Sequence, residues 1–203
     1  MKRISFARLA TLSLLLAALL APPAFTNAAA PAALAPPPEP PAQSESIGVN
    51  GFFSVDPAQQ GTTFQAAIVM EIPRGLHVNS NRPLGKYAVP TSVKIDAPRG
   101  LRITPVSYPR GAVRTFRFGG AASERLAVYE GRAIMRFSVT VPAGYELGVA
   151  RIRANVQFQS CSDEVCFPPT RRELVLPIAI VNRDTPMNRI NQRYFGGGGR
   201  RRR

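Results

Sequence analysis

Two stretches in the second half of the chain alternate strictly between apolar and polar residues. The apolar positions are Met135, Phe137, Val139 and Val141 in the first stretch and Ile152, Ala154, Val156 and Phe158 in the second. A period of two directs successive side chains to opposite faces of a β-strand, so that one face meets the core and the other meets water. Residues 135–141 and 151–159 are therefore predicted to be strands of sheets with one buried face.

Further strands are predicted at 51–55, 63–72, 101–108 and 174–181, which are rich in β-branched, aromatic and other apolar residues. Pro105 has no backbone N–H to donate, which places 101–108 at a sheet edge or at a bulge. The last stretch is apolar on both faces, so it is expected to be more deeply covered than the alternating strands.

Short turn signals separate these strands. Proline, then arginine or alanine, then glycine occurs at 73–75, 98–100, 109–111 and 142–144. Proline presets one backbone angle of a turn and glycine supplies a positive φ. No convincing amphipathic helix is found between the turns. Many short strands joined by turns predict an all-β fold, an immunoglobulin-like β-sandwich that forms a single domain over 47–182.

The N-terminus is expected to be an export signal. Several basic residues precede an apolar run over 9–21, and small residues follow near Ala28. The run is shorter than the roughly 20 residues of a membrane-spanning helix and suits the core of a signal peptide. We therefore predict a cleaved signal peptide at 1–29 and a periplasmic or otherwise exported protein. An uncleaved membrane anchor is the alternative.

Low-complexity segments flank the predicted domain. Residues 30–46 are rich in alanine and proline and predict a semi-rigid, extended linker. Residues 183–203 are polar and end in glycines and arginines, which predicts a disordered tail. The formal net charge is +14, and much of it lies at the two ends of the chain. The tail is either simply solvated or makes weak contact with an anionic membrane. Because few aromatic residues are interleaved with the arginines, sequence-specific nucleic-acid binding is not expected.

The two cysteines of the chain, Cys161 and Cys166, lie in the connection between the predicted strands 151–159 and 174–181. The short stretch between them can turn the chain back and bring the two Cα atoms within the roughly 4.4–6.8 Å that a disulfide needs. An even cysteine count in an exported protein also favours a disulfide. Such a bond could be a structural staple worth about 2 kcal/mol, or it could open and close by thiol–disulfide exchange. The spacing alone does not distinguish a structural disulfide from one that exchanges.

Charged residues near the cysteines have opposing effects on thiol ionisation. Asp163 and Glu164 disfavour a thiolate, whereas Arg171 and Arg172 favour it. His77 is the only histidine, and it is expected to be exposed or hydrogen-bonded in a structural role. One histidine with two cysteines that pair with each other makes a poor metal site. Neither a metal nor another cofactor is therefore predicted.

Four segments of the predicted domain form a recognisable series. They are Gly-Leu-His-Val-Asn-Ser-Asn at 75–81, Val-Pro-Thr-Ser at 89–92, Tyr-Glu-Gly at 129–131 and Gln-Ser-Cys-Ser-Asp-Glu-Val-Cys-Phe-Pro-Pro at 159–169. In this order they resemble the periplasmic N-terminal domain of the thiol:disulfide interchange protein DsbD, a family also described as disulfide bond corrector domains. The last segment is the most specific, and the likeness spans 47–182.

The resemblance implies an immunoglobulin-like sandwich whose Cys161–Cys166 pair cycles between dithiol and disulfide. Cys166 would attack the partner and form the mixed disulfide, and Cys161 would resolve it. The family also shields its cysteines with a cap loop that carries an aromatic residue. In this chain the cap loop would run from about residue 118 to 130, with Tyr129 or Phe118 as the shield.

The resemblance also implies partners. A thioredoxin-like domain or a membrane thiol reductase would donate electrons, and a periplasmic disulfide isomerase or a thioredoxin-like protein of cytochrome c maturation would accept them. The full family protein continues into a membrane domain and a thioredoxin domain, whereas this sequence ends after a short basic tail. A separate membrane reductase is therefore expected to supply the electrons. The alternatives are a redox-silent exported binding module with a structural disulfide and a chaperone-like subunit that uses a free sheet edge.

Overall fold

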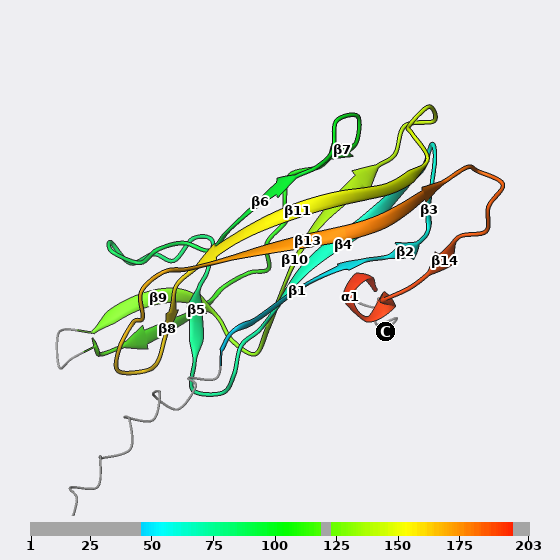
Figure 1. The fold of residues 1–203 in the computed structure, drawn as a ribbon. Helices are drawn as coiled ribbons and strands as arrows, with labels where there is room; N and C mark the ends of the chain where they lie inside the picture. Colours follow the sequence, from blue (N-terminus) through cyan, green and yellow to red (C-terminus); the bar gives the residue numbers. More distant parts are fainter. Residues whose placement is uncertain (1–45, 119–122, 197–203) are drawn as a thin grey trace, which may run out of the picture. The chain divides into compact units, whose positions relative to one another are not determined.

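The computed structural model describes residues 46–118 and 123–196 of the 203-residue chain (Figure 1). The predicted signal peptide at 1–29, all but the last residue of the predicted linker, and the Gly/Arg-rich end of the predicted tail lie outside the described residues. Within the described ranges, no helix has the length and apolar character needed to cross a membrane.

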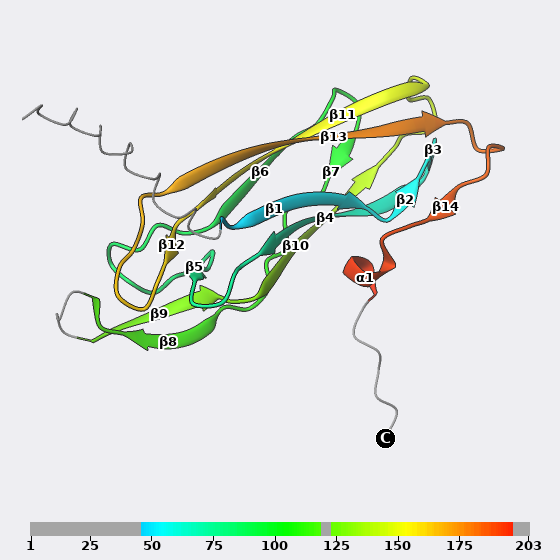
Figure 2. The same cartoon turned by 60° about the horizontal axis from the view of Figure 1, so that its bottom comes forward.

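Two four-stranded sheets face each other across the main core (Figures 1 and 2). The first sheet has the order β1-β4-β10-β7, and its neighbouring strands are all antiparallel. The second has the order β3-β13-β11-β6, in which only β3 and β13 are parallel. The bounds are β1 Gly48–Phe53, β4 Thr63–Glu71, β10 Arg132–Thr140, β7 Arg102–Ile103, β3 Ala58–Gln59, β13 Thr170–Val181, β11 Gly148–Phe158 and β6 Ser92–Asp96. Two packed, mainly antiparallel sheets confirm the predicted all-β, immunoglobulin-like β-sandwich.

The alternating stretches supply much of the core between these sheets. The buried positions are Ala133, Met135, Phe137 and Val139 in β10, and Ala150, Ile152, Ala154, Val156 and Phe158 in β11. Burying an aliphatic or aromatic side chain of this kind stabilises the fold by about 1.5–3 kcal/mol. A slip of one residue would turn the whole apolar set toward water, so the alternation also fixes the strand register.

The predicted strand at 63–72 corresponds to β4, whereas the one at 101–108 is largely absent. Only the two-residue strand β7 and a single bridge at Ser107 pair with β10 in this region. Pro105 lies between these two contacts and has no N–H to donate, so it interrupts the ladder. The expectation of an edge position is consistent with β7 lying at the end of its sheet.

The strand predicted at 174–181 is the second half of β13, but it is not more deeply covered than the alternating strands. Leu176, Ile178 and Ile180 are buried, while Val175 is 50% exposed. That expectation is therefore wrong. The second sheet packs one face on the core and leaves its other face in solvent, even where the sequence is apolar at both sets of positions.

A third sheet, with the order β12-β5-β9-β8, carries the cysteine connection (Figure 2). Its strands are all antiparallel and comprise β12 Ser160–Cys161, β5 His77–Asn79, β9 Glu124–Tyr129 and β8 Ala112–Phe116. One face, with Val78 and Tyr129, joins the main core. The opposite face holds a smaller apolar cluster built on Phe116, Leu126 and Val128. The cysteines therefore lie at a junction where two apolar clusters support the backbone.

Part of the predicted tail belongs to the fold. β14 (Asn188–Arg189) pairs with β2 (Val55–Asp56), and the one-turn helix α1 (Gln192–Phe195) follows. Tyr194 of α1 is buried against side chains of β1 and β4. The prediction that disorder begins at residue 183 is corrected for residues 183–196, because this segment supplies a strand partner and an aromatic ring that covers the first sheet.

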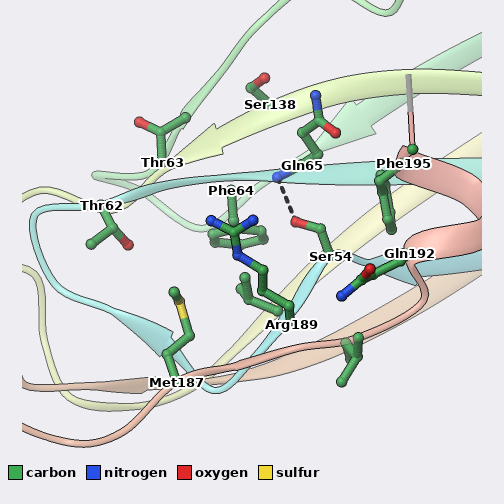
Figure 3. A pocket seen from close by; sticks show the side chains of 13 residues that line it. Ser54, Thr62, Thr63, Phe64, Gln65, Ser138, Met187, Arg189, Gln192 and Phe195 are labelled. Atoms are coloured by element: carbon green, nitrogen blue, oxygen red, sulfur yellow. Dashed lines mark hydrogen bonds between the residues drawn. The ribbon is translucent and has the colours of Figure 1, made fainter. Parts of the chain in front are cut away.

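A pocket of about 530 Å³ lies between this C-terminal segment and β4 (Figure 3). Phe64, Met187 and Phe195 line it, and Arg189 is the one titratable side chain among its described lining residues. The strands β2 and β14 and the helix α1, which contribute lining residues, lie away from β12 in Figure 2. The pocket offers no pair of acid and base groups, and we assign no chemistry to it.

Candidate functional site

The cysteine connection is a tight hairpin whose two arms are joined by a disulfide. Two backbone hydrogen bonds flank the cysteines. One, in the turn, runs from Ser162 to Val165 at 2.8 Å, and the other, at the open end of the hairpin, is 2.9 Å long. Cys161 and Cys166 therefore face each other as a non-hydrogen-bonded antiparallel pair. Such pairs have the closest Cα atoms in a sheet, about 4.5 Å apart. Here the Cα atoms are 3.9 Å apart, below the range expected from the sequence, and the two Sγ atoms are bonded at 2.09 Å.

The two cysteines differ in their access to solvent. Cys161 is fully buried, with 0% of its surface exposed, whereas Cys166 is partly exposed. The turn residues Asp163, Glu164 and Val165 are all exposed. A sulfur that approaches from solvent can therefore reach Cys166 more readily than Cys161.

The charged residues that the sequence places near the pair lie at the surface. Asp163, Glu164, Arg171 and Arg172 are exposed, and the Arg171 guanidinium donates a hydrogen bond of 3.1 Å to Gln157 Oε1. Exposed charges are screened by salt over about 8–10 Å. Their opposing effects on thiol ionisation, expected from the sequence, are therefore both weakened by solvent.

The described residues include no group of three or more His, Cys, Asp or Glu side chains that could hold a metal ion. The chemistry that this arrangement offers is that of the two sulfurs.

Gln159 ties the cysteine hairpin to the rest of the domain. Its Oε1 accepts hydrogen bonds from Val89 N and from Asn79 Nδ2, both at 3.0 Å. Its Nε2 donates to Phe167 O at 3.2 Å. The donor at Val89 and the acceptor at Phe167 together fix which way the amide points. One side chain thus joins the exit of the hairpin to β5 and to the loop that follows it.

Replacing Gln159 with alanine is expected to lower the free energy of unfolding by about 2–3 kcal/mol. The change removes three hydrogen bonds and leaves Asn79 Nδ2, a buried donor, without a partner. Gln157→Ala is the matched control, because among the described residues the Gln157 side chain hydrogen-bonds to Arg171 alone. It should change stability by less than about 0.5 kcal/mol. Urea unfolding measures both. Equal losses would contradict the role of Gln159.

Aromatic rings stack on the face of the third sheet that carries Cys161. His77 is the register partner of Cys161, and directly opposed residues of an antiparallel pair share a face. The His77 ring stacks on Phe116 with centroids 4.0 Å apart, and Phe116 stacks on Phe118 with centroids 5.5 Å apart. The stack thus runs from beside the disulfide to the β8–β9 connection.

The two residues predicted as shields lie on different faces. Phe118 belongs to the stack on the Cys161 face and packs on the smaller apolar cluster. Tyr129 pairs with Val78 and belongs to the main core, and its hydroxyl donates to Asn81 Oδ1 at 2.9 Å. Burial raises the pKa of this phenol. Of the two, Phe118 therefore remains the candidate shield, while Tyr129 has a place in the core.

His77 differs from its expected role. It is a buried residue of a strand, only 2% exposed, rather than an exposed loop residue. Its Nε2 is buried and has no hydrogen-bond partner among the described residues. Burial lowers the pKa of the imidazole below its usual value, while the carboxylates of Asp163 and Glu130 act in the opposite direction. The sole histidine is thus neutral at pH 7 and lies next to the cysteine strand.

The family to which this arrangement belongs follows from comparison with known proteins. Residues 47–177 match the family model described as the N-terminal domain of the thiol:disulfide interchange protein DsbD. The chain belongs to this family. Membership of this family and the Cys161–Cys166 disulfide together support a thiol–disulfide exchange module, as the sequence resemblance implies.

Two solved structures are similar to this chain. The DsbD N-terminal domain of Neisseria meningitidis, in its reduced form, is 18% identical with a TM-score of 0.40, over 70% of this chain and 88% of that one. The N-terminal periplasmic domain of ScsB from Proteus mirabilis is 11% identical with a TM-score of 0.44, over 66% of this chain and 47% of that one. Comparison with curated proteins gave no match.

Two residues of the site were not singled out by the sequence. Phe116 lies in an arginine-rich stretch, and its only local signal is its position two residues before Phe118. Gln159 begins the cysteine segment at 159–169, but its role depends on Asn79 and Val89, which are distant in the sequence. Both roles arise from tertiary contacts that no local pattern contains.

Proposed function

We propose that this domain passes reducing equivalents from a membrane thiol reductase to exported proteins through a reversible Cys161–Cys166 disulfide. The observation that carries the proposal is the asymmetric pair itself, with one buried and one partly exposed cysteine, in a domain of the DsbD N-terminal family. Thiol–disulfide exchange needs an accessible sulfur and a second cysteine to resolve the mixed disulfide. The partly exposed Cys166 and the buried Cys161 support these two roles.

The electron flow follows from these roles. In the reduced domain the Cys166 thiolate attacks one sulfur of the acceptor's disulfide, a bond forms between them, and the acceptor's other sulfur leaves as a thiolate. The Cys161 thiolate then attacks Cys166 Sγ, and the bond from Cys166 to the acceptor breaks. The domain ends as a disulfide and the acceptor as a dithiol, so two electrons have moved. A donor dithiol returns the domain to its reduced state by the same two steps in reverse.

Membership of the DsbD N-terminal family supports partners of the thioredoxin-like kind and an exported location. We propose a thioredoxin-like domain or membrane reductase as the donor, and a periplasmic disulfide isomerase or a thioredoxin-like protein of cytochrome c maturation as the acceptor. Export through a cleaved signal peptide at 1–29, and weak contact of the arginines at 200–203 with an anionic membrane, belong to the same proposal.

Reaction with a reduced thioredoxin tests this function. The full chain is oxidised, mixed with a thioredoxin that is kept reduced by its reductase, and sampled with a thiol-alkylating reagent. We expect both cysteines to become alkylated within seconds to minutes, with no loss of β-structure by circular dichroism. Thiols that appear only after the domain is unfolded would instead indicate a redox-silent module with a structural disulfide.

A further inference from the structure

His77 and Cys161 face each other across two paired strands. They are register partners in β5 and β12, so their side chains share a face of the third sheet with Cβ atoms roughly 4.5–5.5 Å apart. Both are buried, with Cys161 at 0% and His77 at 2% exposure. The side chains of His77 and Cys161 are therefore neighbours on one face of this sheet, in the protein interior.

The imidazole has an unused polar atom. Nε2 of His77 is buried and has no hydrogen-bond partner among the residues that the structure describes. Buried polar atoms are normally paired, and an unpaired one calls for an explanation such as a role in chemistry. Stacking on Phe116 holds the ring in place without that bond. A disulfide sulfur has no proton to donate to Nε2, whereas the thiol of a reduced Cys161 has one.

The charges around the ring favour proton uptake when a proton becomes available. Burial lowers the pKa of His77, so the ring is neutral at pH 7 and has a free lone pair. Asp163, from the cysteine hairpin, and Glu130, which follows β9, stabilise the protonated ring. On β8, Arg114 pairs with Glu130 at 2.9 Å and moderates its effect. Phe116, the β8 residue that touches the ring, is uncharged.

We propose that His77 accepts the proton of Cys161 in the resolving step, an inference that rests on the proposed exchange function. In the mixed disulfide, Cys161 Sγ–H gives its proton to Nε2 of the neutral imidazole. The resulting thiolate attacks Cys166 Sγ, and the Cys161–Cys166 bond forms while the bond from Cys166 to the partner breaks. The partner's sulfur leaves with the electron pair as a thiolate. The imidazolium then gives up its proton, to this thiolate or to water, and the ring is neutral again. The two cysteines are oxidised and the partner is reduced.

An aromatic disulfide, 5,5′-dithiobis(2-nitrobenzoate), isolates the resolving step. The reduced full chain releases one coloured thiolate when Cys166 forms the mixed disulfide and a second one when Cys161 resolves it. We expect His77→Gln to slow the second release by about a hundredfold near pH 7, the lower end of what general-base catalysis supplies. The gap should narrow as the pH rises, because a growing fraction of the Cys161 thiol then ionises without help from the imidazole. The first release should change little.

The outcomes separate this inference from the function on which it rests. A second release that is absent in the unmodified chain would overturn both. A second release that is normal there, and equally fast in His77→Gln at every pH, would overturn the role of His77 alone. An equal slowing at all pH values would also overturn it, since a purely structural effect does not follow thiol ionisation.

A measurement on the unmodified chain keeps the inference testable if His77→Gln does not fold. His77 is the only histidine in the sequence, so its imidazole nitrogens give unambiguous NMR signals. We expect the Nε2 resonance and its titration to shift when the disulfide is reduced. The shift should persist in Cys166→Ala, which keeps the Cys161 thiol, and be lost in Cys161→Ala. Identical titrations in the oxidised and reduced chains would overturn the proposal.

Discussion

Replacing Cys161 with alanine is expected to turn the domain into a trap that stays bonded to its partner through Cys166. Cys166 is the partly exposed member of the pair, so it still attacks a partner disulfide, but no neighbouring thiol can release the product. Intramolecular attack has effective concentrations far above those of free thiols. Turnover should therefore fall by at least about a hundredfold while a mixed disulfide accumulates. Non-reducing electrophoresis and mass spectrometry with an oxidised thioredoxin-like acceptor measure this.

Cys166→Ala is the matched control, because it also removes the disulfide but leaves only the buried sulfur of Cys161. This variant should trap little or no acceptor. If it traps acceptor as well as Cys161→Ala does, accessibility does not decide the roles. If it alone traps acceptor, the roles of the two cysteines are reversed.

Replacing Tyr194 with alanine is expected to cost about 3 kcal/mol in the free energy of unfolding, as for other large buried aromatic residues. Tyr194 is 4% exposed and stacks on Phe52 with ring centroids 4.3 Å apart. Arg193 lies over the ring at 4.7 Å, and Arg136 Nε donates to the Tyr194 carbonyl at 2.7 Å. Losing the ring would uncover apolar surface of the first sheet. Urea unfolding followed by circular dichroism measures the loss.

Tyr87→Ala provides the comparison, since Tyr87 is 82% exposed and should change stability by less than about 0.5 kcal/mol. An unfolding midpoint for Tyr194→Ala equal to that of Tyr87→Ala would show that the C-terminal segment adds nothing to the fold.

The core of the sandwich could be predicted because its signal is local. In β10 and β11 the burial of every second residue repeats the alternation that the sequence displays. The strands β5, β8 and β9 have no such signal. β5 is only three residues long, and in β8 Arg114 occupies a central position. Their pairing depends on neighbours from other parts of the chain, which a local pattern does not contain.

The folded part of the C-terminal segment also could not be predicted from its local sequence. Residues 183–196 are mostly polar, and their two aromatic residues, Tyr194 and Phe195, do not form a periodic pattern. Tyr194 becomes a core residue because Phe52, at the other end of the domain sequence, offers a ring to stack on. Composition alone therefore predicts a tail where tertiary contacts build a strand and a helical turn.

One part of the candidate site could be predicted from the sequence, and another part required the fold. The cysteine pair and its proposed chemistry were indicated by one short segment, 159–169, whose likeness to the DsbD N-terminal family is specific. The position of His77 opposite Cys161 requires the pairing of β5 with β12, and the place of Phe116 requires β8 to lie in the same sheet. The sequence indicates which residues to expect at the site, and only the fold shows which side chains surround them.

The equilibrium between the disulfide and dithiol forms tests the central claim most directly. The full chain is equilibrated in glutathione or dithiothreitol buffers of defined potential, free thiols are trapped, and the fold is followed by circular dichroism. An exchange module should have a reduction potential above about −300 mV and should keep its β-structure when reduced. A potential well below about −300 mV, or unfolding on reduction, would contradict the account and identify the Cys161–Cys166 bond as a structural staple.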